Sequence, residues 1–464
     1  MAPNLPNEIF ILICENIKKR SDKLNLIISC RLFYKLLLPE LYRVIPIQCI
    51  CGRTPKPFDS TFSFTQTILR RPDLARAVRC LYIDVCGEAY CFEPAELGPL
   101  DYDKILIKDA LAMVSETTEE AEEWEVELAD GSIDAWIALS LPFLSRLRSL
   151  HFAPYAGLTF INRTLARAAQ GLEPFELTPV LTSLEEIYIW QCISDIVSPT
   201  VDDILPWFDF PSLKKISGNG VLETGELPIP EGDSSVTELE LYASRCGLGM
   251  KALIESCQGL KSFKYTHAFP VDNHEPFADS LVHAKDTLEE LWLDYFDFKE
   301  PQGPVTQNHW IGSLKGFKQL RKLHVRFDNL FTKDPFGEPN QMLAELLPPS
   351  IELLSITECI DLQACFAVEQ LDILVKDRDT VVPYIKQIQV FAAYTMPVDT
   401  DEWEFLSSLK HGCKEGDIEF ELREFRRDRE DKDRNDAYDE VDSFWVQDYY
   451  HAWDYCLYVM PWLR

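Results

Sequence analysis

The sequence lacks several features that would place it in a common class. In its 464 residues no apolar stretch approaches the roughly 20 residues that cross a bilayer. The apolar run at residues 9–14 is short and has no basic region before it, so we expect no secretory signal. Basic residues number 45 against 76 acidic ones, a formal net charge of −31 that disfavours general nucleic-acid binding. We therefore expect neither membrane nor nucleic-acid partners.

Recognisable catalytic and metal motifs are missing too. The sequence has no G-x-S-x-G elbow, no phosphate-binding P-loop, no H-E-x-x-H and no paired C-x-x-C. Cys49-Ile50-Cys51 alone is too little for a zinc site. The 14 cysteines are scattered, without the dense spacing of a disulfide framework, which indicates reduced thiols in the cytoplasm or nucleus. We predict a non-catalytic protein with no cofactor and no metal.

What is present is ample material for a core and an uneven charge. Hydrophobic residues make up 46% of the chain and aromatic residues 12%, enough for two or more domains or one long repeat array. The first 50 residues hold seven basic and four acidic side chains, although the chain as a whole is strongly acidic. A basic head on an acidic body suggests an acidic partner at the head.

The head also carries apolar residues at helical spacing. Ile9, Leu12, Ile13 and Ile17 predict a first helix. Ser21-Asp22 suits the cap of a second helix, and residues 30–45 predict a third that stops near Pro39. Three short helices in about 40 residues bury little surface and would be marginal alone. Their apolar side chains therefore need a partner or a neighbouring domain.

The segments LPNEIFILICENI and SDKLNLIISCRLFYKLLLPELYR together resemble an F-box of the form common in fungal proteins. The matching positions are Leu5, Pro6, Glu8, Ile9, Ile13, Leu24, Cys30, Arg31, Phe33, Tyr34, Pro39, Leu41, Tyr42 and Arg43. The segment Ile17–Arg20 departs from the family pattern, where a Leu and then a small or apolar linker is frequent.

This resemblance implies a partner. F-box segments bind the acidic Skp-type linker protein of SCF ubiquitin ligases, and through it a cullin scaffold. The residues that the resemblance assigns to linker binding are Leu5, Pro6, Glu8, Ile9, Ile13, Leu24, Arg31, Phe33 and Tyr34. The alternative is that these side chains only pack against the rest of the chain.

The remainder of the chain repeats a short template, apolar-x-x-apolar-x-apolar. It recurs at residues 78–83, 147–152, 184–189, 236–241, 260–265, 288–293, 320–325, 351–356 and 385–390, with a weaker copy at 213–218. Three copies extend to a cysteine at the next expected position, namely Cys86, Cys192 and Cys359. This resembles the leucine-rich repeat pattern, and helix-like segments lie between the copies at 162–172, 250–257, 277–284, 340–347 and 402–410.

We therefore predict an α/β fold: a short helical F-box, then an irregular leucine-rich-repeat horseshoe of helix-loop-strand units with parallel strands. The alternative hypothesis is a doubly wound sheet. The strands of such a sheet are usually continuous apolar runs, which the template copies are not. The predicted domains are residues 1–46 for the F-box, 47–422 for the solenoid with an acidic insertion near 93–132, and 423–464 for a charged and then aromatic segment. This last segment either caps the solenoid or covers its concave face.

The acidic run at residues 115–130 leaves two interpretations open. It is either a solvated helix face or mobile loop, or a docking site for a basic substrate tail.

Strand residues between the apolar positions should point to the concave face, because side chains alternate. The predicted substrate-binding residues are Tyr188, Trp190, Glu240, Tyr242, Trp292, Asp294, His324 and Arg326. Exposed Trp and Tyr side chains are typical anchors, so Trp190→Ala and Trp292→Ala should weaken substrate capture without unfolding the protein. The alternative is that insertions or the C-terminal segment cover them.

Together these features predict a substrate-recognition adaptor of an SCF-type ubiquitin ligase, whose F-box binds the linker and whose repeats bind a protein substrate. A non-degradative interaction scaffold that uses the repeat surface is the alternative.

Overall fold

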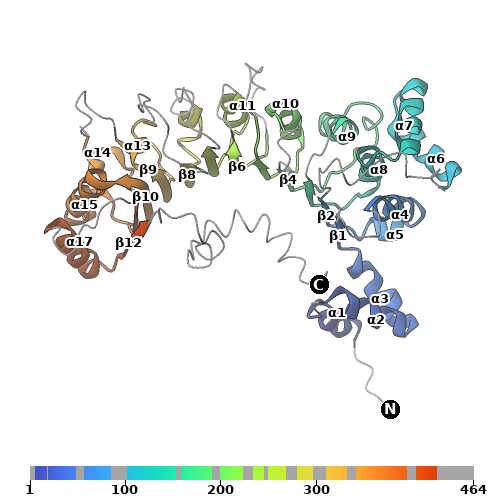
Figure 1. The fold of residues 1–464 in the computed structure, drawn as a ribbon, viewed down its shortest axis with the longest axis horizontal. Coiled ribbons are helices and arrows are strands. Elements are labelled where there is room, and N and C mark those ends of the chain that lie inside the picture. The colour runs from blue at the N-terminus through green and yellow to red at the C-terminus, as the bar shows by residue number, and fades with distance from the viewer. Residues whose placement is uncertain are drawn as a thin grey trace, which may run out of the picture. The chain divides into compact units, whose positions relative to one another are not determined.

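The computed structural model describes twelve stretches of the chain (Figure 1). They are residues 6–17, 19–48, 57–84, 102–152, 158–190, 199–222, 234–244, 249–267, 280–295, 310–331, 341–393 and 404–425. The chain divides into two compact units, with the boundary between Val197 and Ser198. Within each unit the strands follow one another in chain order.

The chain begins with a small three-helix module made of α1 (Asn7–Glu15), α2 (Arg20–Ser29) and α3 (Arg31–Leu41). Ile27 and Leu37 are its buried centre. The side chains packed against this pair are Ile11, Leu26, Phe33, Leu36 and Leu41. This small core accounts for only part of the apolar surface that the module carries.

Two predicted details of these helices are wrong. The cap of α2 is Lys19, which makes no side-chain capping bond, rather than Ser21-Asp22. Pro39 lies inside α3, which continues to Leu41 instead of stopping. Proline removes its own N–H but leaves its carbonyl available, and the Tyr42 amide donates to the Pro39 oxygen at 3.2 Å. The proline is therefore tolerated in the last turn.

In the described part of the rest of the first unit, helices alternate with four short parallel strands. The strands are β1 (Val44–Gln48), β2 (Cys80–Asp84), β3 (Ser149–Phe152) and β4 (Glu186–Trp190). The helices are α4 (Pro57–Arg70), α5 (Pro72–Ala75), α6 (Lys104–Val114), α7 (Thr118–Asp130), α8 (Ile133–Ser140) and α9 (Thr159–Gln170), with the short 3-10 turn η2 (Leu141–Phe143).

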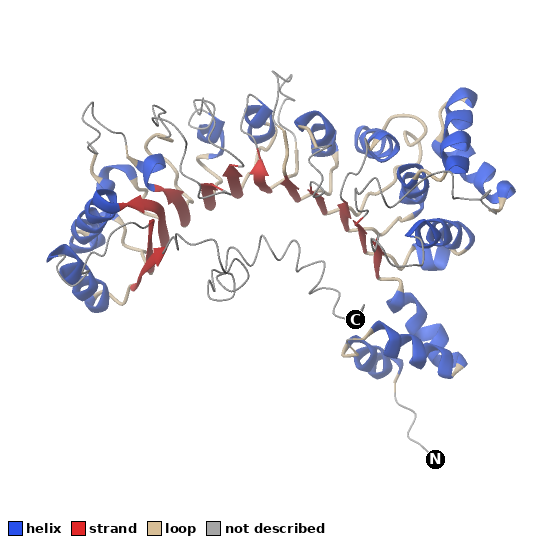
Figure 2. Ribbon diagram, viewed as in Figure 1, coloured by secondary structure: helices blue, strands red, loops and turns tan. Residues whose placement is uncertain are grey.

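The described part of the second unit contains eight parallel strands. They are β5 (Lys215–Asn219), β6 (Glu238–Ser244), β7 (Ser262–His267), β8 (Glu290–Tyr295), β9 (Lys322–Arg326), β10 (Leu353–Ile360), β11 (Gln387–Ala393) and β12 (Glu419–Phe425). The helical segments are α10 (Val201–Ile204), η3 (Leu205–Asp209), α11 (Gly249–Glu255), η4 (Val282–Ala284), α13 (Phe327–Leu330), α14 (Leu343–Leu346), α15 (Asp361–Lys376), α16 (Arg378–Val381) and α17 (Glu404–Glu415). Figure 2 shows the strands on one side of this unit and the helices on the other.

The apolar positions of the template explain why the units stack. Leu239 and Leu241 of β6 pair in register with Phe263 and Tyr265 of β7, and all four side chains are fully buried. A single helix-loop-strand unit cannot cover this apolar face, whereas the next unit can. The predicted α/β class with helix-loop-strand units and parallel strands is confirmed.

Each copy of the template forms a strand, but the sheet extends beyond them. β1 pairs in parallel with β2, so the strands begin at Val44, inside the segment predicted as F-box. β12 pairs with β11 and runs to Phe425. The helices predicted near 162–172, 250–257 and 402–410 are present, whereas the one predicted at 340–347 is reduced to Leu343–Leu346.

The acidic segment 115–130 is helical, as one of the two interpretations expected. The Thr117 side chain accepts from the Glu120 amide at 3.2 Å and caps α7, while Trp124 and Leu128 are buried. Glu120 and Glu123 form ion pairs with Arg163 of α9 at 3.2 and 2.9 Å. Part of the negative charge is therefore used to attach α7 to the repeat body.

Asp134 holds the start of α9 from a neighbouring helix. Its carboxylate accepts from the amides of Phe160 and Ile161 at 2.8 and 2.9 Å, while the cap residue Leu158 supplies no side-chain acceptor. Burial raises the pKa of Asp134 to about 6, although both amides act to lower it. This carboxylate therefore takes the place of the missing cap.

We expect Asp134→Ala to destabilise the protein by about 1 kcal/mol, because two helix-terminal N–H groups lose their acceptor. Hydrogen exchange should be faster at the Phe160 and Ile161 amides. Asp130→Ala, at an exposed position of α7, is the matched control. Unchanged exchange at residues 160 and 161 would show that the carboxylate does not cap α9.

Candidate protein-binding surfaces

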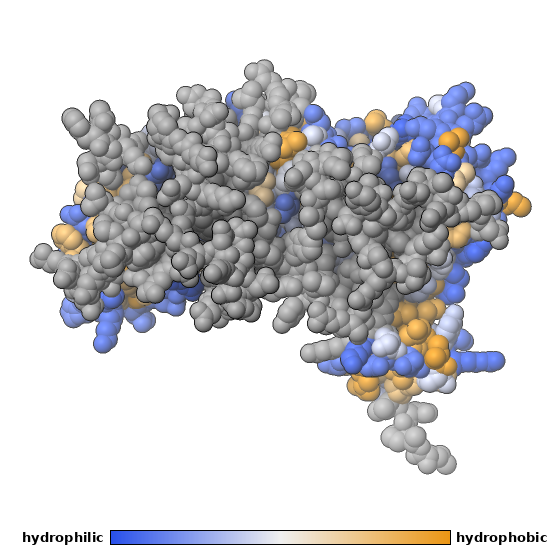
Figure 3. Space-filling view, viewed as in Figure 1, coloured by the Kyte–Doolittle hydropathy of each residue, from blue (hydrophilic) through white to orange (hydrophobic). Residues whose placement is uncertain are grey.

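The three-helix module exposes large apolar side chains that its own core does not use. Seven of them are between 38% and 70% exposed: Ile9, Leu12, Ile13, Leu24, Ile28, Leu32 and Tyr34. Figure 3 shows hydrophobic atoms gathered on this module. Exposed apolar side chains gathered on a small module favour a protein interaction site there. We call these seven residues the apolar face.

The structure places the residues predicted to bind the linker as follows. Pro6, Glu8, Ile9, Ile13, Leu24, Arg31 and Tyr34 are exposed, Phe33 is half-buried, and Leu5 lies outside the described residues. Phe33 packs edge-on against Phe10, with ring centroids 5.3 Å apart, and contacts the Ile27–Leu37 core. Phe33 therefore supports the module from inside.

Tyr34 has a second role inside the first unit. Its hydroxyl is hydrogen-bonded to Arg71, which lies just before α5 (Pro72–Ala75). Hydrogen bonds to Asp73 first, and to Tyr34 second, raise the pKa of Arg71. Tyr34 therefore links the module to the first repeat.

Sequence reasoning missed Leu12, Ile28 and Leu32 as members of the apolar face. The family pattern does not select these positions. The helical spacing of Ile9, Leu12 and Ile13 does, because residues three and four apart lie on one face of a helix. The sequence therefore did contain a signal: the module has more apolar residues at helical spacing than its small core can bury.

A second candidate surface is the row of side chains that alternates with the buried template positions. In the second unit this row is Ser217, Glu240, Lys264, Trp292, His324, Ser355 and Gln389, one residue from each strand β5 to β11. In the first unit the equivalent row contains Tyr82, His151 and Tyr188. Their ring centroids lie 4.4 and 5.6 Å apart.

Several predicted substrate-binding residues are less accessible than expected. Glu240 and Trp292 are 7% exposed, and His324 and Arg326 are 3% exposed. Tyr188, Tyr242 and Asp294 are half-buried, and the Trp190 side chain lies outside the described residues. The expectation that Trp292 is an exposed anchor is therefore wrong. The ring belongs to a packed cluster.

This cluster joins three strands. The Trp292 indole stacks on the His324 ring, with centroids 3.3 Å apart and planes at 8°. His324 Nε2 lies 3.0 Å from Asp294 Oδ2, and Nδ1 lies 2.8 Å from Ser355 Oγ. Since an ionised carboxylate only accepts, Nε2–H donates to Asp294 and the Ser355 hydroxyl donates to Nδ1. The stack and the two hydrogen bonds hold β8, β9 and β10 together.

Ser355, His324 and Asp294 are hydrogen-bonded in the order of a serine-histidine-aspartate triad. They are not accessible to a substrate as a catalytic triad is. Ser355 is fully buried, so no substrate carbonyl can reach its hydroxyl. Burial lowers the pKa of His324 more than Asp294 raises it. The neutral imidazole is therefore a structural element.

His324 should make stability depend on pH. The unfolded chain takes up a proton near the ordinary histidine pKa of about 6.5, whereas the buried ring resists it. Stability should therefore fall as the pH drops below about 6.5. Urea unfolding between pH 7 and 5 measures this effect, and His324→Gln should reduce the slope. An equal slope in wild type and variant would contradict the neutral, buried imidazole.

The charge of Glu240 is compensated within the strand surface. Its carboxylate pairs with Lys215 at 2.8 Å and with Lys264 at 3.3 Å, and Lys264 also reaches Glu290 at 3.6 Å. Burial acts to raise the pKa of Glu240, but the two lysine charges outweigh it and the pKa lies below its usual value. The carboxylate is therefore neutralised by neighbouring strands.

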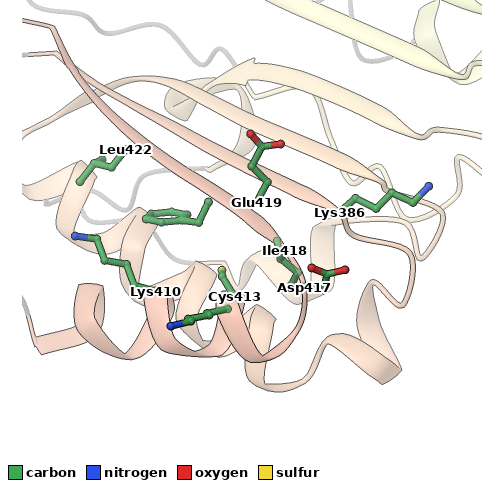
Figure 4. Close-up of a pocket in the computed structure, with 9 residues that line it drawn as sticks. Lys386, Lys410, Cys413, Asp417, Ile418, Glu419 and Leu422 are labelled. Carbon is green, nitrogen blue, oxygen red and sulfur yellow. The ribbon is translucent and has the colours of Figure 1, made fainter.

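A large cavity lies at the last described repeat, between α17 and β12 (Figure 4). Its volume is about 920 Å³, and its lining includes Lys386, Lys410, Asp417 and Glu419. Burial, and secondarily Asp372, raises the pKa of the Cys413 thiol to about 11, so this cysteine is not a reactive nucleophile.

The last described strand, β12, lies beside this cavity. Phe420 and Leu422 pair with the fully buried Ile388 and Val390, yet they are themselves only half-buried. The aromatic segment predicted as a cap or cover, residues 444–464, lies outside the described residues.

No helix in the described stretches is long and apolar enough to cross a bilayer. Nor do they hold a group of three or more His, Cys, Asp or Glu side chains placed to bind a metal ion.

The stacked helix-loop-strand units define an α/β solenoid. Residues 60–407 match the family model described as a leucine-rich repeat domain, well over half of the chain. The chain therefore belongs to the leucine-rich repeat family, whose repeats are typically non-catalytic protein-binding modules. A search of curated proteins gives no match.

Proposed function

We propose that this chain is a substrate-recognition adaptor of an SCF-type ubiquitin ligase. The apolar face binds a Skp-type linker protein, which connects it to a cullin scaffold, and the repeats bind a protein substrate. The observation that carries this proposal is the apolar face on a module whose sequence resembles an F-box. The chain itself would perform no chemistry. It would raise the rate of ubiquitin transfer by holding the substrate near the ligase.

The energetics of the module support a partner at this face. Among the described residues of the module, only Ile27 and Leu37 are buried in its core cluster, so the core is small. Leaving Ile13 and Leu24 about half exposed forgoes part of the stabilisation that burial gives, roughly 25 cal/mol per Å² of apolar area. A linker that covers these side chains would recover it. Since such linkers act in the cytoplasm and nucleus, we propose the same location for this chain.

In the repeat body, the proposed substrate contacts follow the accessible part of the predicted set. Tyr188, Tyr242 and Asp294 are half-buried and remain reachable from the strand surface. Trp292, His324, Arg326 and Glu240 would act through the packing that holds this surface. Trp190 stays in the proposed set by its position in β4 alone.

The test is a pull-down of the full chain with a purified fungal-type Skp linker protein. The comparison variant is Leu5→Ala/Pro6→Ala, which truncates two side chains at the start of the F-box-like segment. Binding by the wild-type chain that is lost in this variant supports the adaptor role. A folded chain that does not bind the linker would refute it.

The alternative is a non-degradative interaction scaffold, which the family membership alone supports. The two roles differ in what the linker-bound chain recruits. An adaptor assembles with a cullin and directs ubiquitin to proteins bound on the repeats. A scaffold binds its partners without that transfer, so reconstituted ubiquitination of co-purifying proteins separates the two.

A further inference from the structure

Arginines precede three consecutive strands in the first unit. Arg43, Arg79 and Arg148 stand immediately before β1, β2 and β3. The amides of Arg79 and Cys80 donate to the Arg43 carbonyl at 2.9 and 3.1 Å, and the amides of Arg148 and Ser149 donate to the Arg79 carbonyl at 2.7 and 3.0 Å. Because neighbouring strands lie about 4.8 Å apart, the repeat itself places these arginines in a row.

A cavity of about 460 Å³ lies at this row. Its charged lining is four arginines, Arg43, Arg76, Arg79 and Arg146, and two carboxylates, Glu40 and Asp73. Pro39 and Ala77 add apolar surface. The whole chain has a net charge of −31, so a cluster of four arginines is a marked local excess of positive charge.

The two carboxylates do not neutralise the four arginines. The Glu40 carboxylate lies 3.6 Å from the Arg43 guanidinium. The Asp73 carboxylate accepts two hydrogen bonds from the Arg71 guanidinium, at 2.9 and 2.7 Å. The Arg71 hydrogen bond lowers the pKa of Asp73, so this carboxylate is fully ionised and already engaged. Among the described residues no ion pair involves Arg76 or Arg146. These two guanidinium groups therefore remain available.

Arg79 is fixed at the centre of the cluster. Its guanidinium donates to the backbone carbonyls of Arg76 and Val78 at 2.7 and 3.1 Å. Burial lowers its pKa, and the nearby charges of Arg146, Arg148 and Arg43 lower it further. Positive charges that repel one another in a fixed arrangement favour the binding of an anion.

We propose that this cavity binds a phosphorylated side chain of a peptide. Four positive and two negative groups leave a lining of net charge +2, which matches a phosphate monoester that carries close to two negative charges at neutral pH. Arginine presents its N–H groups in a planar fork suited to phosphate oxygens. The cavity is larger than one phosphate group, and its apolar surface accommodates the residues beside the modified one.

Polyanions fit the surroundings less well. The net charge of −31 repels a nucleic acid or an anionic membrane, each of which presents many charges over a large area. A single phosphorylated residue needs only the local cluster. The inference stands apart from the ligase role, because binding can be measured on the full chain alone.

The test measures fluorescence anisotropy of a labelled short Gly/Ala peptide with one central phosphoserine, titrated with the full chain. We expect it to bind at least about tenfold more tightly than the same peptide with serine, since charge-assisted arginine contacts are lost. Arg76→Gln/Arg146→Gln should remove most of this difference without changing thermal unfolding, because neither side chain has an ion pair to lose. Arg321→Gln, an exposed arginine of the second unit, is the control and should bind as wild type does.

Three results would overturn the proposal. One is equal affinity for the serine and phosphoserine peptides. Another is phosphopeptide binding that the double variant does not weaken. The third is inorganic phosphate, or a phosphatidylserine vesicle, binding with the affinity of the phosphopeptide, which would assign the cluster to a free anion or to a membrane.

Discussion

Ile9→Ala/Ile13→Ala is expected to abolish linker binding while leaving the fold intact. Both side chains are exposed on α1, at 38% and 47%, so truncating them removes little internal packing. Alanine is also the best helix former. If both are anchors of the interface at about 2 kcal/mol each, the affinity falls by roughly a thousandfold. Isothermal titration calorimetry with the linker measures the loss.

Leu177→Ala is the matched control for this experiment. Leu177 is an apolar residue of the same unit, 90% exposed, and lies outside the three-helix module. This variant should bind the linker as tightly as wild type. A double variant that keeps wild-type affinity would show that α1 does not contribute to the interface, and the apolar face would lose its proposed role.

Trp292→Ala should be the most destabilising change on the strand surface. The indole is 7% exposed and stacks on His324, which bonds to Asp294 and Ser355. Removing it leaves a cavity beside a buried polar network, at a cost of about 3 kcal/mol. Urea unfolding followed by circular dichroism measures this. The sequence alone predicted that this change would weaken substrate capture without unfolding the protein. Because the Trp292 indole is buried, we now expect a loss of stability instead.

Tyr384→Ala is the control for the loss of an aromatic side chain, because Tyr384 is 63% exposed. It should unfold at nearly the same urea concentration as wild type. If Trp292→Ala did the same, the indole would be solvent-accessible and available as a binding anchor. The stacked cluster would then not hold the strands together.

The repeat architecture could be predicted because one physical rule governs every copy. Each template places apolar side chains where they are fully buried, as Leu239 and Leu241 are, and polar ones between them. β1 escaped prediction because Pro46 interrupts its apolar run. Proline is tolerated there because β1 pairs with only one strand, β2, among the described residues, so the missing N–H breaks no known ladder.

The accessibility of the strand surface could not be predicted from alternation alone. Alternation says to which side a residue points, but not what lies over it. Trp292 and His324 are 32 positions apart in sequence, and only the β8–β9 register brings their rings together. Lys215 and Lys264 likewise meet Glu240 from the adjacent strands β5 and β7. Such contacts depend on the register between neighbouring strands, and the sequence of one strand does not specify that register.

The apolar face was only partly predictable for a different reason. The resemblance selected Ile9, Ile13 and Leu24, which are exposed, but also Phe33, which is half-buried and packed on Phe10. A family pattern mixes residues that bind a partner with residues that hold the module together. Burial in the structure separates the two sets.

Hydrogen exchange of the full chain with and without the linker locates the proposed contact. We expect slower exchange across α1, α2 and α3, with little change in β5 to β12, because in the proposed complex the linker covers the apolar face and not the repeats. Protection confined to the repeats, with none in residues 7–41, would contradict it. The three helices would then be a structural extension of the solenoid rather than its docking module.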